Sequence, residues 1–423
     1  MAETKYYANS YIDPSDGQRR FFKDLEAARD VDYQVTKAAT ISNTKAIASL
    51  PISNGGLPTS YTLEQSSNPA FTTTDKSAVD QVLSSMGGYL LLNKNGRTYA
   101  AKLNNDWSRF IDGTPISSDL EAITETMIHV PKVYYKGEGK TVHIFGLQGP
   151  SDALTYDGPH WVGAYIASGN SNGLHSRPNV TPVHSQTMST FQSWAQKLGS
   201  NWGQWKYSTW QIINLLYQAK FGNLDSQTTI GAGFQNSNWT ACRDVPMGLT
   251  KSLGNGSGSV LYNNATIGNQ YPVKLFGFED LWGKLWQFTP GIRFYMDGST
   301  RHAVLYDGNV VSNSATGRDV SPVLSSASGT YANTMQLGTY CDMICQSASG
   351  SSSTYYCDGY WASTGGELLV VGAYAGDGSR CGLSASASSD GFGVSAAYVG
   401  ARLAFFSEPV IVSGAELKSL AGV

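Results

Sequence analysis

Two histidine–serine pairs are the residues of this sequence that come nearest to a catalytic pattern. His175 precedes Ser176 in "HSRP", and His184 precedes Ser185 in "HSQT". A histidine beside a serine could act as the general base for a nucleophilic hydroxyl. However, the sequence has no His-Glu-x-x-His zinc motif and no Gly-x-x-x-x-Gly-Lys phosphate loop. We therefore predict no catalytic residues and expect that the chain is not an enzyme.

The cysteines are the second group with possible chemistry, and all five lie in the second half of the chain. Cys341 and Cys345 are separated by three residues and could bind zinc together with Cys357, but no second ligand pair follows at zinc spacing. An odd count without a signal peptide argues against a disulfide framework. We expect buried thiols, no metal and no cofactor. The remaining two cysteines are Cys242 and Cys381.

Composition excludes several classes of partner. Charged residues make up 14% of the chain and hydrophobic residues 41%, and the net charge is −3 without a run of basic residues. We therefore expect no nucleic-acid partner. No window of about 18 apolar residues is present, so no membrane span is predicted. The shortage of charge is made up by Gly, Ser, Thr and Asn, which is typical of loop-rich, β-rich proteins.

Turn signals and apolar patterns divide the chain into four parts. Residues 1–30 are polar and predict an N-terminal arm, and residues 31–117 predict a small β-rich region for attachment or oligomerisation. That region contains one expected helix, at "DKSAVDQVLSSM", and a hairpin at Asn95-Gly96. Residues 118–412 form a larger domain, which the resemblance described below implies to be ligand-binding, and residues 413–423 form a C-terminal tail.

Two helices are predicted inside the larger domain. "STFQSWAQKLG" starts with Ser189 and Gln192 at capping-box spacing, and "STWQIINLLYQAKFG" repeats the pattern with Ser208 and Gln211 and ends at Gly222. The second helix places its apolar residues on one face; these are Ile212, Leu215, Leu216 and Ala219. Short strands precede the helices and many short strands and long loops follow them, so the predicted fold class is α+β.

The stretch "LFGFEDLWGKLWQFTPGIRF" (275–294) carries a family resemblance. Trp282-Gly283 and Trp286 are similar to the "GNVWEW" signature of C-type lectin folds of the formylglycine-generating-enzyme type, and the ending "VGARLAF" resembles their closing "GFRLA" strand. "GAYIASG" and "NLDSQTTIGAG" look like the first half of the same fold. The resemblance covers about residues 120–410 and implies a C-type lectin fold. Trp282 and Trp286 are expected to be core residues.

Three functional branches share this fold, and the residues discriminate among them. The formylglycine-generating enzymes need a pair of cysteines near the C-terminal strand, where this chain has Cys381 alone, with Cys357 the next. Calcium-dependent lectins use Glu-Pro-Asn or Gln-Pro-Asp with Trp-Asn-Asp, and none of these triplets occurs. The third branch contains the variable proteins of diversity-generating retroelements, which in phages are receptor-binding proteins at the tail-fibre tip. There, mutagenic reverse transcription rewrites adenines in the segment before the final strand.

A compositional test follows from that third branch. Randomised asparagine codons that keep a pyrimidine at the third base cannot encode Lys, Glu, Gln, Met or Trp. These five types make up 62 of the 423 residues, so about six are expected in the 39 residues from Leu368 to Phe406. None occurs, and Glu367 and Glu408 bracket the gap. We interpret residues 368–399 as the variable region.

Within this region, glycines are expected at turns and close contacts, Leu383, Leu403 and Phe405 in the core, and the other positions facing solvent. Aromatic and Arg side chains, here Tyr374, Phe392, Tyr398 and Arg380, are the expected energetic anchors. The glycines are Gly372, Gly376, Gly378, Gly382 and Gly400. The predicted ligand-binding residues are Ala373, Tyr374, Asp377, Arg380, Ser386, Asp390, Phe392, Val394, Ala397 and Tyr398.

The resemblance implies a phage or prophage receptor-binding protein that sets host tropism and is located in the virion, at the tail-fibre tip, after synthesis in the bacterial cytoplasm. The expected partners are a host cell-surface receptor (protein or glycan), other tail proteins and copies of the same chain, with a homotrimer expected first. Two alternatives stay open. One is a static bacterial surface adhesin or lectin; the other is a formylglycine-generating-enzyme-like or cell-wall-acting enzyme. The absence of a signal peptide favours the virion protein.

Overall fold

The structure is a computed structural model, and it describes residues 6–7, 10–12, 19–21, 57–63, 67–307 and 311–423. The chain divides into two compact units, Met1–Gly55 and Gly56–Val423. In the first unit, β1 (Tyr6–Tyr7), β2 (Ser10–Ile12) and β3 (Arg19–Phe21) form an antiparallel sheet. The rest of the expected arm, and residues 31–56 of the expected β-rich region, lie outside the described residues.

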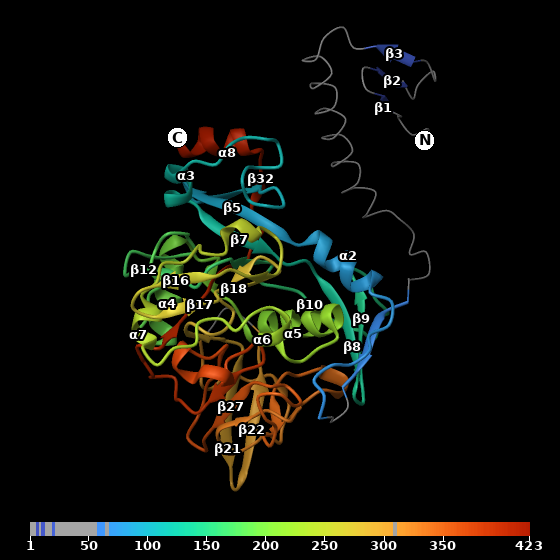
Figure 1. Cartoon of the computed structure of the whole chain (residues 1–423), viewed down its shortest axis with the longest axis vertical. Helices are drawn as coiled ribbons and strands as arrows, with labels where there is room; N and C mark the ends of the chain where they lie inside the picture. The colour runs from blue at the N-terminus through green and yellow to red at the C-terminus, as the bar shows by residue number, and fades with distance from the viewer. Residues whose placement is uncertain (1–5, 8–9, 13–18, 22–56, 64–66, 308–310) are drawn as a thin grey trace. The chain divides into compact units, whose positions relative to one another are not determined.

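A seven-stranded sheet joins distant parts of the second unit (Figure 1). Its strands, in spatial order, are β14 (Trp202–Gln204), β31 (Leu403–Phe405), β11 (Trp161–Gly163), β7 (Glu125–His129), β5 (Gly87–Lys94), β6 (Arg97–Lys102) and β32 (Val410–Ile411). The predicted hairpin is confirmed: Asn95 and Gly96 connect β5 to β6 with φ values of 52° and 73°, as a two-residue turn of this type requires.

The boundary expected between residues 117 and 118 is therefore corrected, because strands from both sides of it share one sheet. The expected C-terminal tail is also part of this unit. It forms α8 (Gly414–Ala421), whose N-cap Ser413 accepts the amide of Glu416, and it buries Leu417. Gly414 packs so closely on the ring of Phe110 that an added Cβ would lie 2.3 Å from it.

The remaining helices lie beside and between the sheets. They are α2 (Ser77–Ser85), α3 (Ser118–Ile123), α4 (Met188–Ala195), α5 (Tyr207–Phe221), α6 (Ser226–Thr229) and α7 (Trp239–Arg243), with 3-10 turns η1 (Gln196–Leu198), η2 (Lys251–Leu253), η3 (Gly338–Tyr340) and η4 (Ala375–Arg380). The three predicted helices are confirmed as α2, α4 and α5.

The predicted helix starts are wrong in detail. α4 is capped by Thr187, whose hydroxyl accepts the Thr190 amide, and not by Ser189. α5 begins after Lys206 without a side-chain cap, and it ends as predicted at Gly222, with φ 64°. α5 is also buried on nearly all sides from Tyr207 to Ala219 instead of on one face. The reason is its position: it contacts α2 and the strands of the neighbouring four-stranded sheet.

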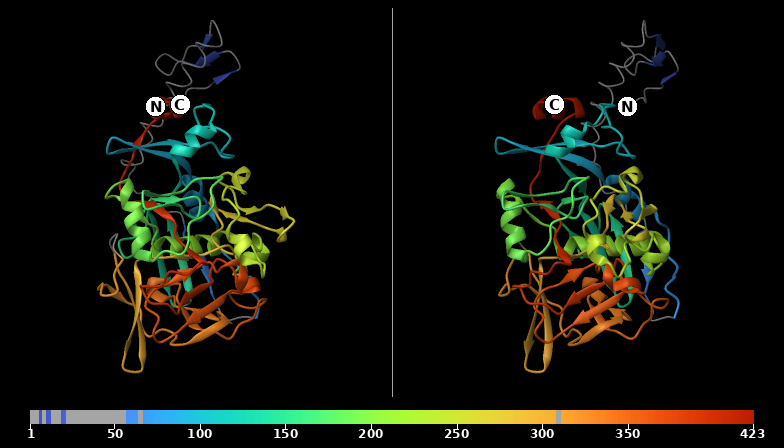
Figure 2. Two further views of the ribbon diagram at one scale, coloured as in Figure 1. Left: turned by 90° about the vertical axis from the view of Figure 1, so that its left-hand side faces the viewer. Right: turned by 60° about the vertical axis from the view of Figure 1, so that its left-hand side comes forward.

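That four-stranded sheet has the order β10 (Leu154–Tyr156), β8 (Val133–Glu138), β9 (Thr141–Gly146) and β4 (Thr59–Thr62). A six-stranded sheet, seen in the lower half of both views of Figure 2, contains β24 (Ala327–Tyr331), β27 (Gly359–Ala362), β29 (Ser386–Ser388), β28 (Val370–Val371), β20 (Trp286–Phe288) and β30 (Val399–Gly400). The smaller sheets use β12 (Ser168–Asn170), β13 (Gly173–His175), β15 (Gly258–Ser259), β16 (Tyr262–Asn264), β17 (Gly268–Gln270), β18 (Val273–Leu275), β19 (Phe278–Glu279), β21 (Ile292–Asp297), β22 (Thr300–Leu305), β23 (Arg318–Asp319), β25 (Thr334–Met335) and β26 (Cys345–Ser347). The architecture is mixed α+β, as predicted.

One buried arginine joins three of the segments that carry the resemblance. Arg402 donates to the carbonyl of Gly163 at 2.9 Å, to the carbonyl of Glu279 at 2.8 Å and to Gln287 Oε1 at 3.0 Å. Trp282 and Trp286 are buried, as predicted. The three segments, which lie up to 239 residues apart in the sequence, thus meet in one core.

All five cysteines are free and buried, which confirms the expected thiols. Among the described residues, no group of three or more His, Cys, Asp or Glu side chains is placed to hold a metal ion. Within the same residues, no helix has both the length and the apolar character needed to cross a membrane.

Candidate binding face

The predicted variable region contributes three strands to the six-stranded sheet. It begins as β28, turns at Gly372, runs through η4, returns as β29, and reaches β30 after a loop at residues 389–398. Gly372 has φ 89°, and an added Cβ would lie 2.2 Å from the carbonyl oxygen of Leu281. This position therefore admits glycine alone, as expected for a close contact.

The middle of the region is buried, which corrects two predicted ligand contacts. Every residue from Cys381 to Ser388 is buried, so Ser386 cannot meet a ligand, and Ala373 is likewise fully buried. The physical reason is that β29 pairs on one side with β27 and on the other with β28. At Gly382, an added Cβ would lie 1.8 Å from Asp358 Oδ1. The small residues of this stretch fill a crowded interior strand.

The other eight predicted contacts lie on two loops, residues 374–380 and 389–398, which we call the loop pair. Arg380 is exposed and the remaining seven are half-buried. The seven are Tyr374, Asp377, Asp390, Phe392, Val394, Ala397 and Tyr398. Leu383, Leu403 and Phe405 are buried in the core, as predicted.

Three aromatic rings meet where the two loops approach each other. The ring centroids of Tyr374 and Tyr398 are 5.2 Å apart, and Trp239 packs edge-on against them at 5.3 Å from Tyr374 and 6.3 Å from Tyr398. The Arg243 guanidinium lies 5.7 Å from the Trp239 ring. We call Trp239, Tyr374 and Tyr398 the aromatic cluster. Such rings bring large contact area with little side-chain entropy to lose.

Trp239 was not predicted from the sequence. It belongs to α7, more than a hundred residues before the variable region, and it joins the face because Asn236 donates its amide to the Ala375 carbonyl at 3.0 Å. The one signal in the sequence is a tryptophan in the Asn- and Ser-rich stretch "NSNWT". That signal indicates a half-exposed aromatic but does not reveal which loop it contacts.

The backbone of the 389–398 loop is held by residues outside the variable region. Glu367 Oε2 accepts the amide of Phe392 at 3.2 Å, Ser185 donates its amide to the Ala396 carbonyl at 3.2 Å, and Trp286 donates its amide to the Tyr398 carbonyl at 3.0 Å. These anchors use main-chain atoms of the loop, so they do not depend on which side chains the loop carries.

Burial shifts the pKa values of titratable groups on the face towards their neutral forms. Burial raises the pKa of Asp377 to about 6, while its Oδ2 accepts the Tyr374 amide at 3.2 Å. Burial also raises the pKa of Asp390 and of the phenols of Tyr374 and Tyr398. Both phenols are therefore neutral near pH 7 and able to donate and accept hydrogen bonds.

The two histidine–serine pairs differ in their hydrogen-bond partners. His175 Nδ1 lies 2.8 Å from Glu125 Oε1, and the Ser176 hydroxyl donates to the Thr126 carbonyl at 2.8 Å, so each is engaged in the fold. His184 Nδ1 lies 2.7 Å from the hydroxyl of Ser185, its neighbour in the chain. Burial lowers the pKa of His184, with the positive charge of Arg243 as a second cause.

No known family model matches the chain, and a comparison with curated proteins gives no significant match.

Proposed function

We propose that the chain is a receptor-binding protein of the phage tail-fibre type, with a C-type lectin scaffold that displays the loop pair as a variable binding face. The observation that carries this proposal is the division of the region into a buried strand and two anchored, solvent-facing loops. A protein whose contacts change from copy to copy needs this separation, because substitutions on the loops leave the core intact.

The lack of Lys, Glu, Gln, Met and Trp supports diversification over fewer residues than the sequence alone indicated. Burial alone accounts for the lack of long polar residues from Cys381 to Ser388. The diversification argument therefore rests on the loop pair, where exposure permits Lys, Glu or Gln and none occurs. The aromatic cluster and Arg380 supply the side-chain types that dominate protein interfaces.

The partner is a receptor on a host cell surface, and the chain acts as an oligomer in a virion. In a homotrimer, three faces presented together would multiply individually weak contacts into useful avidity. The small β-rich segments before the second unit serve attachment to other tail proteins in this proposal.

The test is binding to a panel of bacterial cells by the fluorescently labelled chain. Tyr374→Ala and Tyr398→Ala should each weaken binding at least tenfold, the scale of a hot-spot aromatic, with an unchanged melting temperature. Tyr340→Ala is the matched control, since Tyr340 is 38% exposed and lies outside the loop pair. Equal losses for Tyr340→Ala and Tyr374→Ala would refute the assignment of the face.

The gene neighbourhood separates this function from a static adhesin. We expect a reverse transcriptase and a near-identical copy of the coding segment for the loop pair, with differences confined to adenines of the copy. A gene without either, whose product still binds cells through Tyr374 and Tyr398, would be a static surface adhesin or lectin.

A further inference from the structure

Two clefts meet at Lys206, away from the residues of the loop pair. Their volumes are about 610 Å³ and 430 Å³. They have five lining residues in common: Tyr135, Thr155, Lys206, Ser208 and Asp307. Together they form one groove, which we call the Lys206 cleft, and it contains none of the predicted contact residues. Phe406 and Glu408 lie towards one end and Arg318 towards the other.

Lys206 is a half-buried cation without an ionic partner in the described part of the chain. Its Nζ lies 5.2 Å from the centre of the Phe406 ring, and among the described residues no carboxylate oxygen lies within 4 Å of it. Burial lowers the pKa of Lys206, and the negative charge of Asp307 opposes part of this shift. A cation that is partly removed from water gains free energy when ligand oxygens replace the lost hydration.

The other charges of the cleft are mixed in sign. Asp157 is paired with Lys132 at 3.0 Å and Arg318 with Asp342 at 3.0 Å. Of the remaining lining charges, Lys206 is positive, whereas Asp307 and Glu408 are negative and form no ion pair with any described residue. A simple anion would face two carboxylates, and a metal ion would face the ammonium. A neutral ligand that carries both donors and acceptors suits this set.

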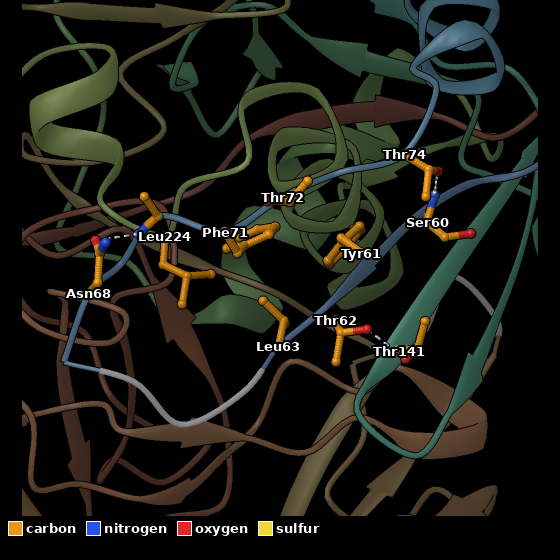
Figure 3. Close-up of a pocket in the computed structure, with 11 residues that line it drawn as sticks. Ser60, Tyr61, Thr62, Leu63, Asn68, Phe71, Thr72, Thr74, Thr141 and Leu224 are labelled. Carbon is orange, nitrogen blue, oxygen red and sulfur yellow. Dashed lines mark hydrogen bonds between the residues drawn. The ribbon is translucent and has the colours of Figure 1, made fainter.

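The cleft in Figure 3 is a groove of similar size that has no charged lining residues. It has a volume of about 630 Å³ and is lined by uncharged residues. Several of its hydroxyls are already engaged. The Tyr61 hydroxyl donates to Gln218 Oε1 at 3.1 Å, and the hydroxyls of Thr62 and Thr141 bond to each other at 2.8 Å (Figure 3). Size alone therefore does not mark a site, whereas the unpaired charges of the Lys206 cleft do.

We propose that the Lys206 cleft binds a neutral saccharide, whose hydroxyls accept from Lys206 and donate to Asp307. The ring of Phe406 supplies the apolar surface on which the C–H face of a sugar ring packs. This site is separate from the loop pair, and it stands whether or not the loop pair is variable.

Saturation-transfer NMR on the full chain tests the proposal, with four probes: maltotriose, cellotriose, methyl β-galactoside and the trimer of N-acetylglucosamine. At least one should receive saturation. Lys206→Met, which keeps the apolar stem over Phe406, and Asp307→Asn should each weaken its binding about tenfold or more, as expected for loss of a charge-assisted hydrogen bond. Lys197→Met, at an exposed lysine, should change nothing.

Far-UV circular dichroism and thermal unfolding show whether the variants fold. Saturation of none of the four probes would overturn the proposal, as would equal binding by Lys206→Met and the wild type, or binding of phosphate or acetate at Lys206 in place of every sugar. Tyr374→Ala separates this site from the proposed function. If it abolishes saccharide binding while Lys206→Met does not, the saccharide is a ligand of the loop pair and the cleft is not a site.

Discussion

Replacing Arg402 with methionine tests whether three distant segments form a single scaffold for the binding face. The guanidinium is fully buried and donates to Gly163, Glu279 and Gln287. Methionine fills much of the same volume but donates nothing, so three buried oxygens lose a partner at about 1–3 kcal/mol each. Burial disfavours the guanidinium and lowers the pKa of Arg402 to about 9, so its removal offsets part of that cost. We expect the free energy of unfolding to fall by about 3–5 kcal/mol.

The assay is urea unfolding followed by tryptophan fluorescence, with the denaturant slope compared between variants. Arg380→Met is the matched control, because Arg380 is exposed on the loop pair, and surface changes of this kind cost less than about 0.5 kcal/mol. A loss below about 1 kcal/mol for Arg402→Met, or an equal loss for Arg380→Met, would refute the idea that Arg402 holds the scaffold together.

Three further predictions concern the same region. Ser386→Asn should lower the free energy of unfolding by about 1–3 kcal/mol, because Ser386 is buried in β29, while Ser395→Asn on the exposed loop should be neutral in thermal unfolding; equal effects would contradict the assigned burial. Burial raises the pKa of Asp377 to about 6, so the folded chain keeps a proton between about pH 4 and 6 that the unfolded chain has lost, and the wild type loses stability as pH rises through that window. Asp377→Asn should therefore be more stable than the wild type by about 1–2 kcal/mol at pH 7 and equal to it near pH 4 in urea titrations; a difference independent of pH would rule this out. All five thiols are buried, and burial raises the pKa of Cys341 and Cys345 to about 12. Ellman's reagent should therefore label the thiols much more slowly in the folded chain than in guanidinium chloride. Fast labelling of the folded chain would show that the thiols are accessible.

The features that sequence predicted correctly are governed by local rules. A hairpin at Asn95-Gly96 requires positive φ at two adjacent residues, and the end of α5 at Gly222 requires one left-handed residue. Burial of Trp282 and Trp286 follows from their size and their glycine-rich surroundings. Each of these depends on a few neighbouring residues, so a short stretch of sequence contains the information.

The features that sequence missed depend on distant pairing. The boundary expected at residue 117 fails because β5 and β7 lie on either side of it and pair in one sheet, which β31 extends from near the C-terminus. Trp239 joins the binding face through ring contacts with Tyr374 and Tyr398, far along the chain. On an ordinary amphipathic helix one face is exposed to solvent, but in α5 that face is covered by other elements. No local pattern encodes such contacts.

The buried stretch "GLSASAS" makes the proposed variability testable by position. Glycine, alanine and serine read equally well as a flexible loop or as a crowded strand, and the structure selects the strand because β27 and β28 flank β29. If related copies of this chain differ through rewriting of adenines, their differences should gather on residues 374–380 and 389–398. Residues 381–388 should stay small, because a larger side chain at Gly382 would meet Asp358. Differences spread evenly over both sets would contradict the separation of scaffold from face. Conservation of the loops and the strand alike would instead favour a static adhesin that uses the same rings for one fixed ligand.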